Sequence, residues 1–338
     1  MIDGAFIFDC VVHRIDMSDA NLAERSDTEP VIQSIVAGSR LMQAPDYHSL
    51  NYRRGFSVEE MYEMVFIDAP TDMAMVQVVP QFEWFKELYA PVRLQHEFAE
   101  AYPDRVLFCG GVDPLDTGLV TALEQIEYQV KELGACSMKF YNGHVPRGWR
   151  CDDEQIAYPM YEKCRDVGVN VIQFHKGLPF GTGNVEEMHP GDLQQAARDF
   201  PDMTFVMHHL AMPYVDEAIN IASRFPNIYL ALSANFQFLL TSPRAVVTWV
   251  GQCLQAVGSD RLLWGSEAAL SGGPLPYLEA FMAMEMPEDL REGYGYPEIT
   301  RRDREKILGL NFARLMGVDV AAKQRELGLV AAPLRQKT

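Results

Sequence analysis

Four side chains that can bind a metal ion each stand at the end of a short apolar run. They are His13, His175, His209 and Glu267. Neutral imidazole and carboxylate oxygen are good ligands for Zn(II), Mn(II) and Fe(II), and three or four of them around an open position make a catalytic site. Their joint occurrence predicts a divalent metal ion that activates water or polarises a substrate oxygen, with zinc expected and manganese or iron as alternatives.

The apolar runs that carry these residues have the length and composition of buried β-strands. Their C-terminal ends can converge only if the strands lie parallel in one sheet, and a parallel sheet closed on itself brings these ends to one face. Eight such runs occur, at residues 5–13, 73–80, 106–113, 137–141, 169–175, 203–209, 227–233 and 261–266. This count predicts an α/β fold, a distorted (β/α)8 TIM barrel with its site at the C-terminal face.

The segments between the runs carry helical periodicity and helix-end signals. Helices are expected over residues 83–102, 117–133, 153–167, 192–200, 215–225 and 243–257. No linker divides the chain, so residues 1–338 are predicted to form a single domain. The long segment 14–68 after the first strand is expected to be a lid or binding insertion. The segment 319–338 is a C-terminal tail, either an arm for a partner or a frayed end.

Composition narrows the classes of function. The formal net charge of −18 and the pI near 4.8 argue against a nucleic-acid surface and an anionic membrane, which both need clustered Lys and Arg. No run of 18 apolar residues and no basic leader is visible, so a cytoplasmic protein without a membrane span or signal peptide is expected. The six cysteines lack CxxC spacing and are interpreted as reduced, buried side chains.

Side-chain alternation along the predicted strands gives further expectations. Asp9, Val11 and His13 fall on one face of the first strand, and Cys10 falls on the other. Val11 occupies the place where a second ligand would most naturally sit, and it cannot bind metal. The Asp9 side chain either points into the barrel one layer of side chains below His13, or it is a buried acid that accepts backbone hydrogen bonds. By the same alternation, His208 is expected to face outward into packing, opposite to the histidine that follows it.

Cationic and imidazole side chains near the strand ends are expected to bind the substrate. Arg53 could hold a carboxylate, with a solvated ion pair as the alternative. Lys139 ends the fourth strand, where it pairs with Glu267 or a substrate carboxylate or, once carbamylated, bridges two metals. Lys176 precedes Gly177. A glycine turn can redirect the chain, so the sequence does not indicate which way the Lys176 side chain points. His189 either contacts the substrate or caps the helix that follows it.

Three motifs at these strand ends carry a resemblance to a known family. The strand ends, together with His175-Lys-Gly-Leu-Pro179, His189-Pro-Gly-Asp192 and Trp264-Gly-Ser-Glu267, resemble the amidohydrolase superfamily, in particular its aminocarboxymuconate-semialdehyde-decarboxylase-like branch. The resemblance covers nearly the whole predicted barrel, from Asp9 to about Gly317. It implies a metal enzyme that acts on small carboxylated molecules by hydrolysis, hydration or non-oxidative decarboxylation.

The resemblance also implies roles for individual residues. His13 matches the second member of the family's strand-one motif of acid or histidine, any residue, histidine, and Val11 replaces the first member. Glu267 matches the strand-eight aspartate, which binds metal and assists proton transfer. His209 matches the strand-six histidine that positions or polarises substrate or water. His209 and Glu267 are therefore the expected catalytic residues.

The replaced ligand at Val11 leaves two interpretations open. In the first, Glu267 compensates, and the chain is a mononuclear decarboxylase or hydrolase of a small-molecule carboxylic acid and forms a homo-oligomer. In the second, the chain is a modified or supporting subunit in a hetero-oligomer with a more complete paralogue. Some relatives of similar fold use a dinuclear iron or manganese centre for oxygenation, which is a variant of the second interpretation. The substrate assignment rests on analogy of fold.

Overall fold

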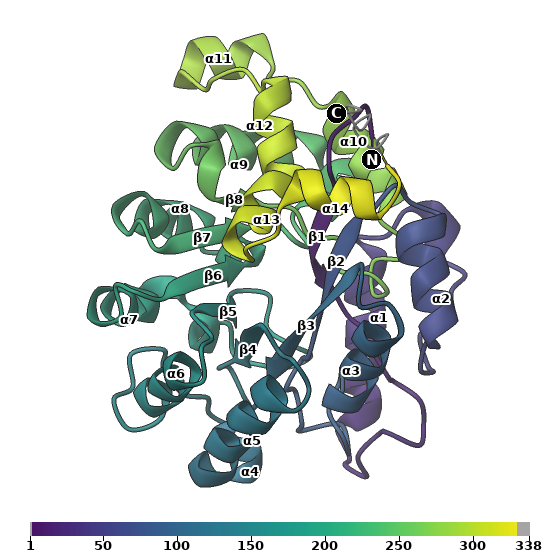
Figure 1. Cartoon of the computed structure of the whole chain (residues 1–338), viewed down its shortest axis with the longest axis vertical. Helices are drawn as coiled ribbons and strands as arrows, with labels where there is room; N and C mark the ends of the chain where they lie inside the picture. Colours follow the sequence, from purple (N-terminus) through teal and green to yellow (C-terminus); the bar gives the residue numbers. More distant parts are fainter. Residues whose placement is uncertain (1, 330–338) are drawn as a thin grey trace, which may run out of the picture.

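Eight strands form one parallel sheet in the computed structural model, which describes residues 2–329. Neighbours in the sheet follow the chain order from β1 to β8. The strands are β1 (Phe8–Val12), β2 (Met73–Gln77), β3 (Val106–Gly111), β4 (Ser137–Tyr141), β5 (Val171–His175), β6 (Thr204–His208), β7 (Ile228–Ala231) and β8 (Leu262–Leu263). Each predicted run contains one of these strands, and the predicted (β/α)8 barrel is confirmed (Figure 1).

The first strand closes the barrel through hydrogen bonds to the segment after β8. The N–H of Cys10 donates to the carbonyl of Trp264 at 3.0 Å, and the N–H of Glu267 donates to the carbonyl of Val11 at 3.1 Å. These bonds fix the backbone of Glu267 beside β1. The side chain of His13 follows directly after this strand, so closure of the barrel brings the first and last expected ligands together.

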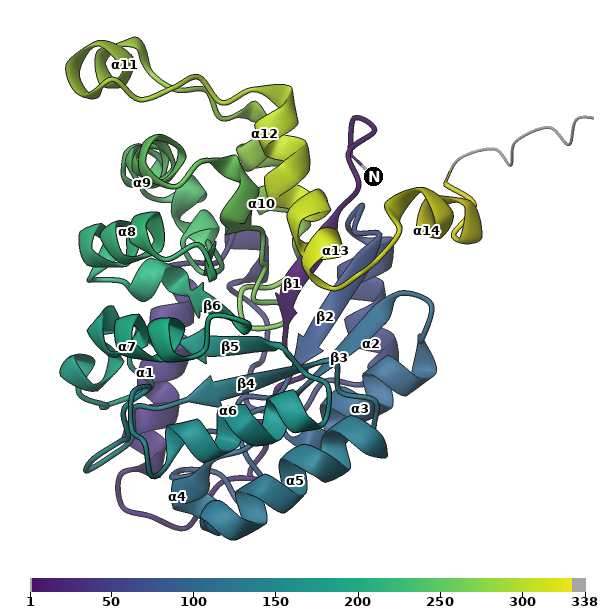
Figure 2. The ribbon, with the colours of Figure 1, turned by 60° about the vertical axis from the view of Figure 1, so that its left-hand side comes forward.

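Helices cover the outer face of the strands (Figures 1 and 2). The helices that follow β2 are α3 (Val92–Ala101), α4 (Pro114–Thr117), α5 (Leu119–Lys131), α6 (Ala157–Asp166), α7 (Leu193–Asp199), α8 (Val215–Arg224), α9 (Pro243–Ala256), α10 (Leu275–Ala283), α11 (Glu288–Tyr294), α12 (Arg301–Glu305), α13 (Asn311–Leu315) and α14 (Val320–Glu326). The helix predicted over residues 83–102 is shorter than expected, because Pro91 stands directly before its first turn. Within residues 2–329, every helix is too short or too polar to cross a membrane.

The insertion after β1 is largely helical. It contains α1 (Thr28–Arg40), the short turn η1 (Pro45–Tyr47), α2 (Val58–Tyr62) and the π-helical turn η2 (Glu63–Ile67). A capping box between Ser57 and Glu60 begins α2. The tips of β4 and β5 point toward α1 in Figure 2, and α1 residues line the same pocket as His175. The helix α1 therefore lies over the C-terminal mouth of the barrel, where a lid would lie.

The predicted tail begins with a helix. The Nζ of Lys323 in α14 donates to the carbonyl of Asp104 at 2.9 Å, which ties this helix to the body of the molecule. Residues 330–338 lie outside the described residues. A partner-binding role for the tail stays a prediction.

Alternate side chains of the strands fill the barrel interior, and Phe312 of α13 closes its base by packing on Phe8 at a ring distance of 4.7 Å. Cys10 belongs to this inner cluster, so the prediction that it faces away from His13 is wrong. The register of β1 on β2 shifts between Asp9 and Val12. This irregularity breaks the simple alternation and turns both Cys10 and His13 inward. All six cysteines are free, as predicted, and all but Cys136 are buried.

Candidate metal centre

The structure brings the four expected ligands together at the C-terminal mouth of the barrel. The Nε2 of His13 lies 3.5 Å from Oε2 of Glu267. The Nδ1 of His209 lies 3.8 Å from Oε1 of the same carboxylate, and the Nε2 of His209 lies 3.1 Å from Nδ1 of His175. All four residues line one pocket.

Each of the three imidazoles has one ring nitrogen against a backbone carbonyl. A carbonyl oxygen can only accept a hydrogen bond, so these nitrogens carry the ring hydrogen in the neutral side chain. The pairs are Nδ1 of His13 with the Gln77 carbonyl at 2.9 Å, Nε2 of His175 with the Leu178 carbonyl at 2.9 Å and Nδ1 of His209 with the Ser233 carbonyl at 3.0 Å. This arrangement fixes the tautomer of all three rings, as is usual for metal ligands.

The remaining ring nitrogens consequently face other acceptors. The free nitrogens of His175 and His209 present two lone pairs at 3.1 Å, and the Nε2 of His13 faces the Glu267 carboxylate at 3.5 Å. Oε1 of Glu267 accepts no hydrogen bond from the described residues. Lone pairs placed in this way repel one another unless a cation lies between them. A divalent metal ion is such a cation, and His209 and Glu267 belong, together with His208, to a group whose ligand atoms all lie within 4.8 Å of one another.

Burial sets the ionisation state of these groups. It lowers the pKa of His209 to about 4 and that of His175 well below its usual value, so both rings are neutral near pH 7. Burial alone would raise the pKa of the Glu267 carboxyl, but contact with His13 and the positive charge of Lys139 hold that pKa well below its usual range. Glu267 is therefore an ionised carboxylate, as a metal ligand must be.

The backbone explains how His209 and Glu267 reach the site. Both lie just beyond a strand and have left-handed backbone angles, with φ at 62° for His209 and 58° for Glu267. Non-glycine residues adopt this region at a cost, and such strained residues concentrate at functional sites. Ala234, one residue beyond the carbonyl that fixes His209, shares the feature with φ at 62°. The backbone thus turns directly after each of these strands, and the turn directs the side chains of His209 and Glu267 into the barrel mouth.

The same backbone turn overturns the prediction for His208. Alternation along β6 puts His208 on the inner face with Val206, and His209 then turns inward through its positive φ. The Nε2 of His208 lies 2.8 Å from Oε1 of Gln173, and its Nδ1 lies 3.2 Å from Oγ of Ser233. His208 lies close enough to His209 and Glu267 to share a metal. Both of its nitrogens are nevertheless occupied, so we place it in the hydrogen-bond network beneath the site.

Asp9 and Lys139 are two charged residues whose side chains are buried in the barrel. Oδ1 of Asp9 accepts hydrogen bonds from the N–H groups of Val11 at 3.1 Å and Ser266 at 2.9 Å, which matches the expectation of a buried acid bound to backbone. Burial raises the pKa of Asp9 to about 7. Lys139 is buried and forms no ion pair within 4.0 Å with any described residue, so the expected structural pair with Glu267 is not formed. Burial lowers the pKa of Lys139 to about 8.

The pocket above these residues has a volume of about 410 Å³. Its floor is the cluster of His13, His175, His209 and Glu267, and its wall is largely apolar. The wall comes from α1, from the loops after β2, β5 and β6, and from residues beyond β7 and β8, and includes Ile35, Leu41, Met42, Val79, Tyr89, Tyr141, Leu178, Pro179, Phe180, Met212, Phe238 and Leu270. Tyr89 was not predicted as a pocket residue, because it stands in the segment that was expected to be helical.

Three predicted substrate-binding residues have other partners and do not line this pocket. Lys176 is buried in an ion pair with Asp192 at 2.7 Å. His189 caps the turn that follows it by accepting the N–H of Gly191 at 3.1 Å, which is the second of its two expected roles. Arg53 pairs with Asp19 at 2.8 Å and with Glu29. Arg53, Lys176 and His189 thus lie outside the lining of this pocket, and a role for them in substrate binding stays a prediction.

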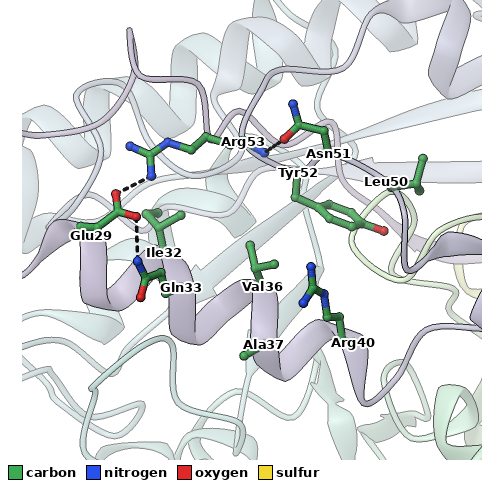
Figure 3. Close-up of a pocket in the computed structure, with 10 residues that line it drawn as sticks. All are labelled: Glu29, Ile32, Gln33, Val36, Ala37, Arg40, Leu50, Asn51, Tyr52 and Arg53. Atoms are coloured by element: carbon green, nitrogen blue, oxygen red, sulfur yellow. Dashed lines mark hydrogen bonds and ion pairs between the residues drawn. The ribbon is translucent and has the colours of Figure 1, made fainter.

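Arg53 lines a second cavity of about 400 Å³ between α1 and residues 50–53 (Figure 3). The picture shows Arg53 reaching toward Glu29 at one end of this cavity, with Arg40 at the other end. Ile32, Val36 and Ala37 of α1 lie between them. The helix α1 therefore has an open space on each of two faces, one over the central pocket and one toward this loop.

Comparison with known proteins identifies the family. The sequence matches the Amidohydrolase family model over residues 37–318, which is most of the chain. The chain therefore belongs to the amidohydrolase family, and the resemblance seen in its strand-end motifs is confirmed.

Individual relatives are more distant. The chain is 33% identical over 96 residues to the protein fluG of Emericella nidulans, and these residues span 28% of this chain and 11% of that protein. An uncharacterised TIM-barrel protein of Bordetella bronchiseptica is similar over 92% of this chain and 98% of its own, with 23% identity and a TM-score of 0.66. The 5-carboxyvanillate decarboxylase of Novosphingobium aromaticivorans, solved with manganese and 4-hydroxy-3-methoxy-5-nitrobenzoic acid, is similar over 93% of this chain and 97% of its own, with 14% identity and a TM-score of 0.59.

Proposed function

We propose that this chain is a metal-dependent enzyme that acts on a small carboxylated substrate by hydrolysis or non-oxidative decarboxylation. The observation that carries the proposal is the set of three imidazoles next to the Glu267 carboxylate, each with one ring nitrogen fixed by a backbone carbonyl: His13 and His209 lie 3.5 and 3.8 Å from the carboxylate, and His175 lies 3.1 Å from His209. Family membership supports it, and so does the decarboxylase of similar fold that was solved with manganese and a substituted benzoic acid. Zinc is the first metal to test, with manganese and iron as alternatives.

Each residue has a defined part in this proposal. His13, His175 and Glu267 would hold the metal ion, and His209 is either the fourth ligand or the acid and base of the reaction. The bound metal supplies Lewis acidity toward a substrate oxygen or a water molecule. Glu267 keeps its carboxylate ionised in the buried floor of the pocket. His209 is neutral near pH 7, so its free Nε2 can accept a proton at the floor of the pocket.

The alternative of a supporting subunit rests on Val11, which cannot bind metal. Val11 is fully buried, and its side chain lies against Gly265. Four donors nevertheless come from this chain alone, because His209 turns inward beside the other three. This observation favours an enzyme that binds its metal without help from a paralogue.

Metal analysis tests the proposal directly. Plasma mass spectrometry of the purified protein should find about one zinc, manganese or iron per chain, because His13 and His209 both lie next to Glu267 and His175 lies next to His209. His175→Ala and Glu267→Ala should each remove most of this metal. His189→Ala is the matched control, because His189 is a half-exposed histidine outside the pocket. Full metal content in both ligand variants would refute the assignment.

Expression with the neighbouring genes distinguishes the two interpretations. A metal-loaded homo-oligomer by light scattering would support the self-sufficient enzyme, and a screen of carboxylic acids for carbon dioxide release or hydrolysis then identifies the reaction. A chain that is metal-free alone and gains iron or manganese only with a paralogue would support the heteromeric alternative.

A further inference from the structure

The second cavity, drawn in Figure 3, shares the helix α1 with the central pocket. One face of α1 lines the central pocket through Ile35 and Gly38, and another face lines the second cavity through Ile32 and Val36. The volume of about 400 Å³ is sufficient for a small organic ligand. None of the described residues that line this cavity belongs to the metal-binding floor. The proposed reaction therefore leaves the second cavity without a function.

Arg40 gives this cavity an unpaired cation. It stands in the last turn of α1, and its side chain rises toward residues 50–53 (Figure 3). The chain has 47 acidic and 29 basic residues, yet no described residue forms an ion pair or a hydrogen bond with the guanidinium group of Arg40. A guanidinium group has five N–H donors and no acceptor, and its shape matches a carboxylate. Arg40 therefore offers a position for an anionic group.

The opposite end of the second cavity has the reverse charge. Arg53 is paired there with Asp19 at 2.8 Å and with Glu29. Two carboxylates thus share one guanidinium group, which leaves this end with a net negative charge. Positions 29 and 40 lie about 16 Å apart along α1, from the rise of 1.5 Å per residue in an α-helix. A ligand that carries a second anionic group toward Arg53 is therefore disfavoured.

The wall between the two ends is apolar. It comes from Ile32 and Val36 of α1 and from Leu50 and Tyr52 of the facing segment. Apolar groups of a ligand are stabilised when they leave water for such a surface. The combination of one unpaired cation and an apolar wall fits an aliphatic chain that ends in a single carboxylate.

We propose that the second cavity binds a small aliphatic monocarboxylate, with its carboxylate on Arg40 and its chain between α1 and residues 50–53. This binding needs neither the metal ion nor the central pocket, so it goes beyond the proposed function and does not depend on it. A ligand between α1 and the facing segment adds contacts that an opened α1 lacks, and it shifts the population toward the closed form. The acid is thus an effector that holds α1 over the central pocket.

Calorimetric titration with octanoate tests the site. Octanoate should bind at least about tenfold more tightly than octanamide, because the amide has the same chain but cannot form a charge-assisted pair with Arg40. Octanedioate should also bind more weakly than octanoate, since its second carboxylate points toward Glu29. The affinity for octanoate should be unchanged in His175→Ala, the variant that we expect to lose the metal.

Paired variants locate the binding within the protein. Arg40→Gln should weaken octanoate binding at least about tenfold. Arg147→Gln is the matched control and should leave the affinity unchanged, because Arg147 is an exposed arginine outside this cavity that has no ion pair with any described residue. Ala37→Glu adds a carboxylate one turn before Arg40, whereas Ala37→Gln adds an uncharged side chain of the same size. Octanoate should bind the Glu variant at least about fivefold more weakly than the Gln variant, although both residues favour a helix equally.

Hydrogen exchange tests the effect on α1. Octanoate should slow exchange of the α1 amides about twofold to fivefold in the unaltered protein and leave it unchanged in Arg40→Gln. No binding of octanoate, equal binding of octanamide, or full affinity in Arg40→Gln would overturn the site. Binding that disappears in His175→Ala would place octanoate on the metal and would overturn it as well. Binding that depends on Arg40 but leaves α1 unprotected would refute the effector role.

Discussion

The two adjacent histidines after β6 show how hydrogen bonds divide the roles of similar side chains. His208 and His209 lie side by side, yet only His209 keeps a ring nitrogen free, because its other nitrogen is bound to the Ser233 carbonyl. Both nitrogens of His208 are occupied by Gln173 and Ser233. A histidine binds a metal ion or accepts a proton through a ring nitrogen that has no other partner. This chemistry is therefore available to His209 and not to His208.

This difference predicts opposite phenotypes for the two histidines. His209→Asn should weaken metal affinity at least about tenfold, since a ligand or its close support is lost. His208→Asn should retain the metal and lower the free energy of unfolding by about 1–3 kcal/mol, because buried hydrogen bonds are broken. Metal titration against a competing chelator and urea unfolding measure the two effects. Loss of metal in His208→Asn with full retention in His209→Asn would reverse the assignment.

His144 is a further buried histidine, and it lies outside the candidate metal centre. His144 lies between two carboxylates, with Nδ1 at 2.8 Å from Glu83 and Nε2 at 2.7 Å from Asp113. Burial alone would lower the pKa of His144, but the hydrogen bonds to Asp113 and Glu83 raise it to about 10. The side chain is therefore an imidazolium near pH 7. It ties together three loops that follow β2, β3 and β4.

The raised pKa of His144 makes its contribution to stability depend on pH. The contribution is complete below the ordinary histidine value of about 6.5, and it is lost as the pH rises toward the folded pKa of about 10. His144→Gln should lower the free energy of unfolding by about 3 kcal/mol at pH 6, because two buried carboxylates lose their cation. Urea unfolding at pH 6 and pH 10 should show this deficit shrinking. An equal deficit at both values would contradict the ion-pair explanation.

At the scale of elements, α1 is the part of the barrel mouth best placed to move. One face carries Ile35 and Gly38 over the central pocket, and another carries Val36 and Arg40 over the cavity of Figure 3. Val31, Ile32 and Ile35 hold α1 in the core, but a helix that borders open space on two faces is expected to open locally more often than the strands, which are buried on both faces. This arrangement supports the predicted lid function of the insertion.

Hydrogen exchange followed by mass spectrometry checks this prediction. Amides of α1 should exchange faster than those of β4 and become protected when benzoate binds to the metal-loaded protein. Gly38→Ala should slow exchange in α1 about twofold to fivefold, because alanine favours the helix by about 0.5–1 kcal/mol. The added Cβ meets no atom within 4 Å, so the variant introduces no clash. Exchange in α1 as slow as in β4 would refute the lid.

The elements were more predictable from the sequence than the directions of their last residues. Period and composition located every strand, and β4 was predicted with its observed bounds, Ser137–Tyr141. The inward turn of His209 depends on a positive φ, and the inward position of Cys10 depends on a register shift. Neither the positive φ nor the register shift can be detected in the alternation of side chains along a strand. Tyr89 escaped notice because tertiary contacts, and not local periodicity, bring its segment to the pocket.

The whole molecule carries a formal net charge of −18, and the pocket that we assign to a carboxylate has no lysine or arginine in its described lining. An approaching anion is therefore repelled at long range before it reaches the cationic centre in the floor. Salt shortens the reach of this repulsion, since the Debye length is about 10 Å at 0.1 M ionic strength. The association of anions should then become faster as salt is added, contrary to enzymes that steer anions with positive fields.

Stopped-flow measurement of binding to the metal-loaded protein tests this expectation. The association rate constant of benzoate should rise about twofold to fivefold between roughly 20 and 300 mM salt, because the repulsion is screened. Benzamide, which has the same ring and no charge, is the control and should show no such rise. A rate constant for the anion that falls with salt would mean that a local positive field at the mouth outweighs the net charge. The barrel would then attract anions despite its acidic surface.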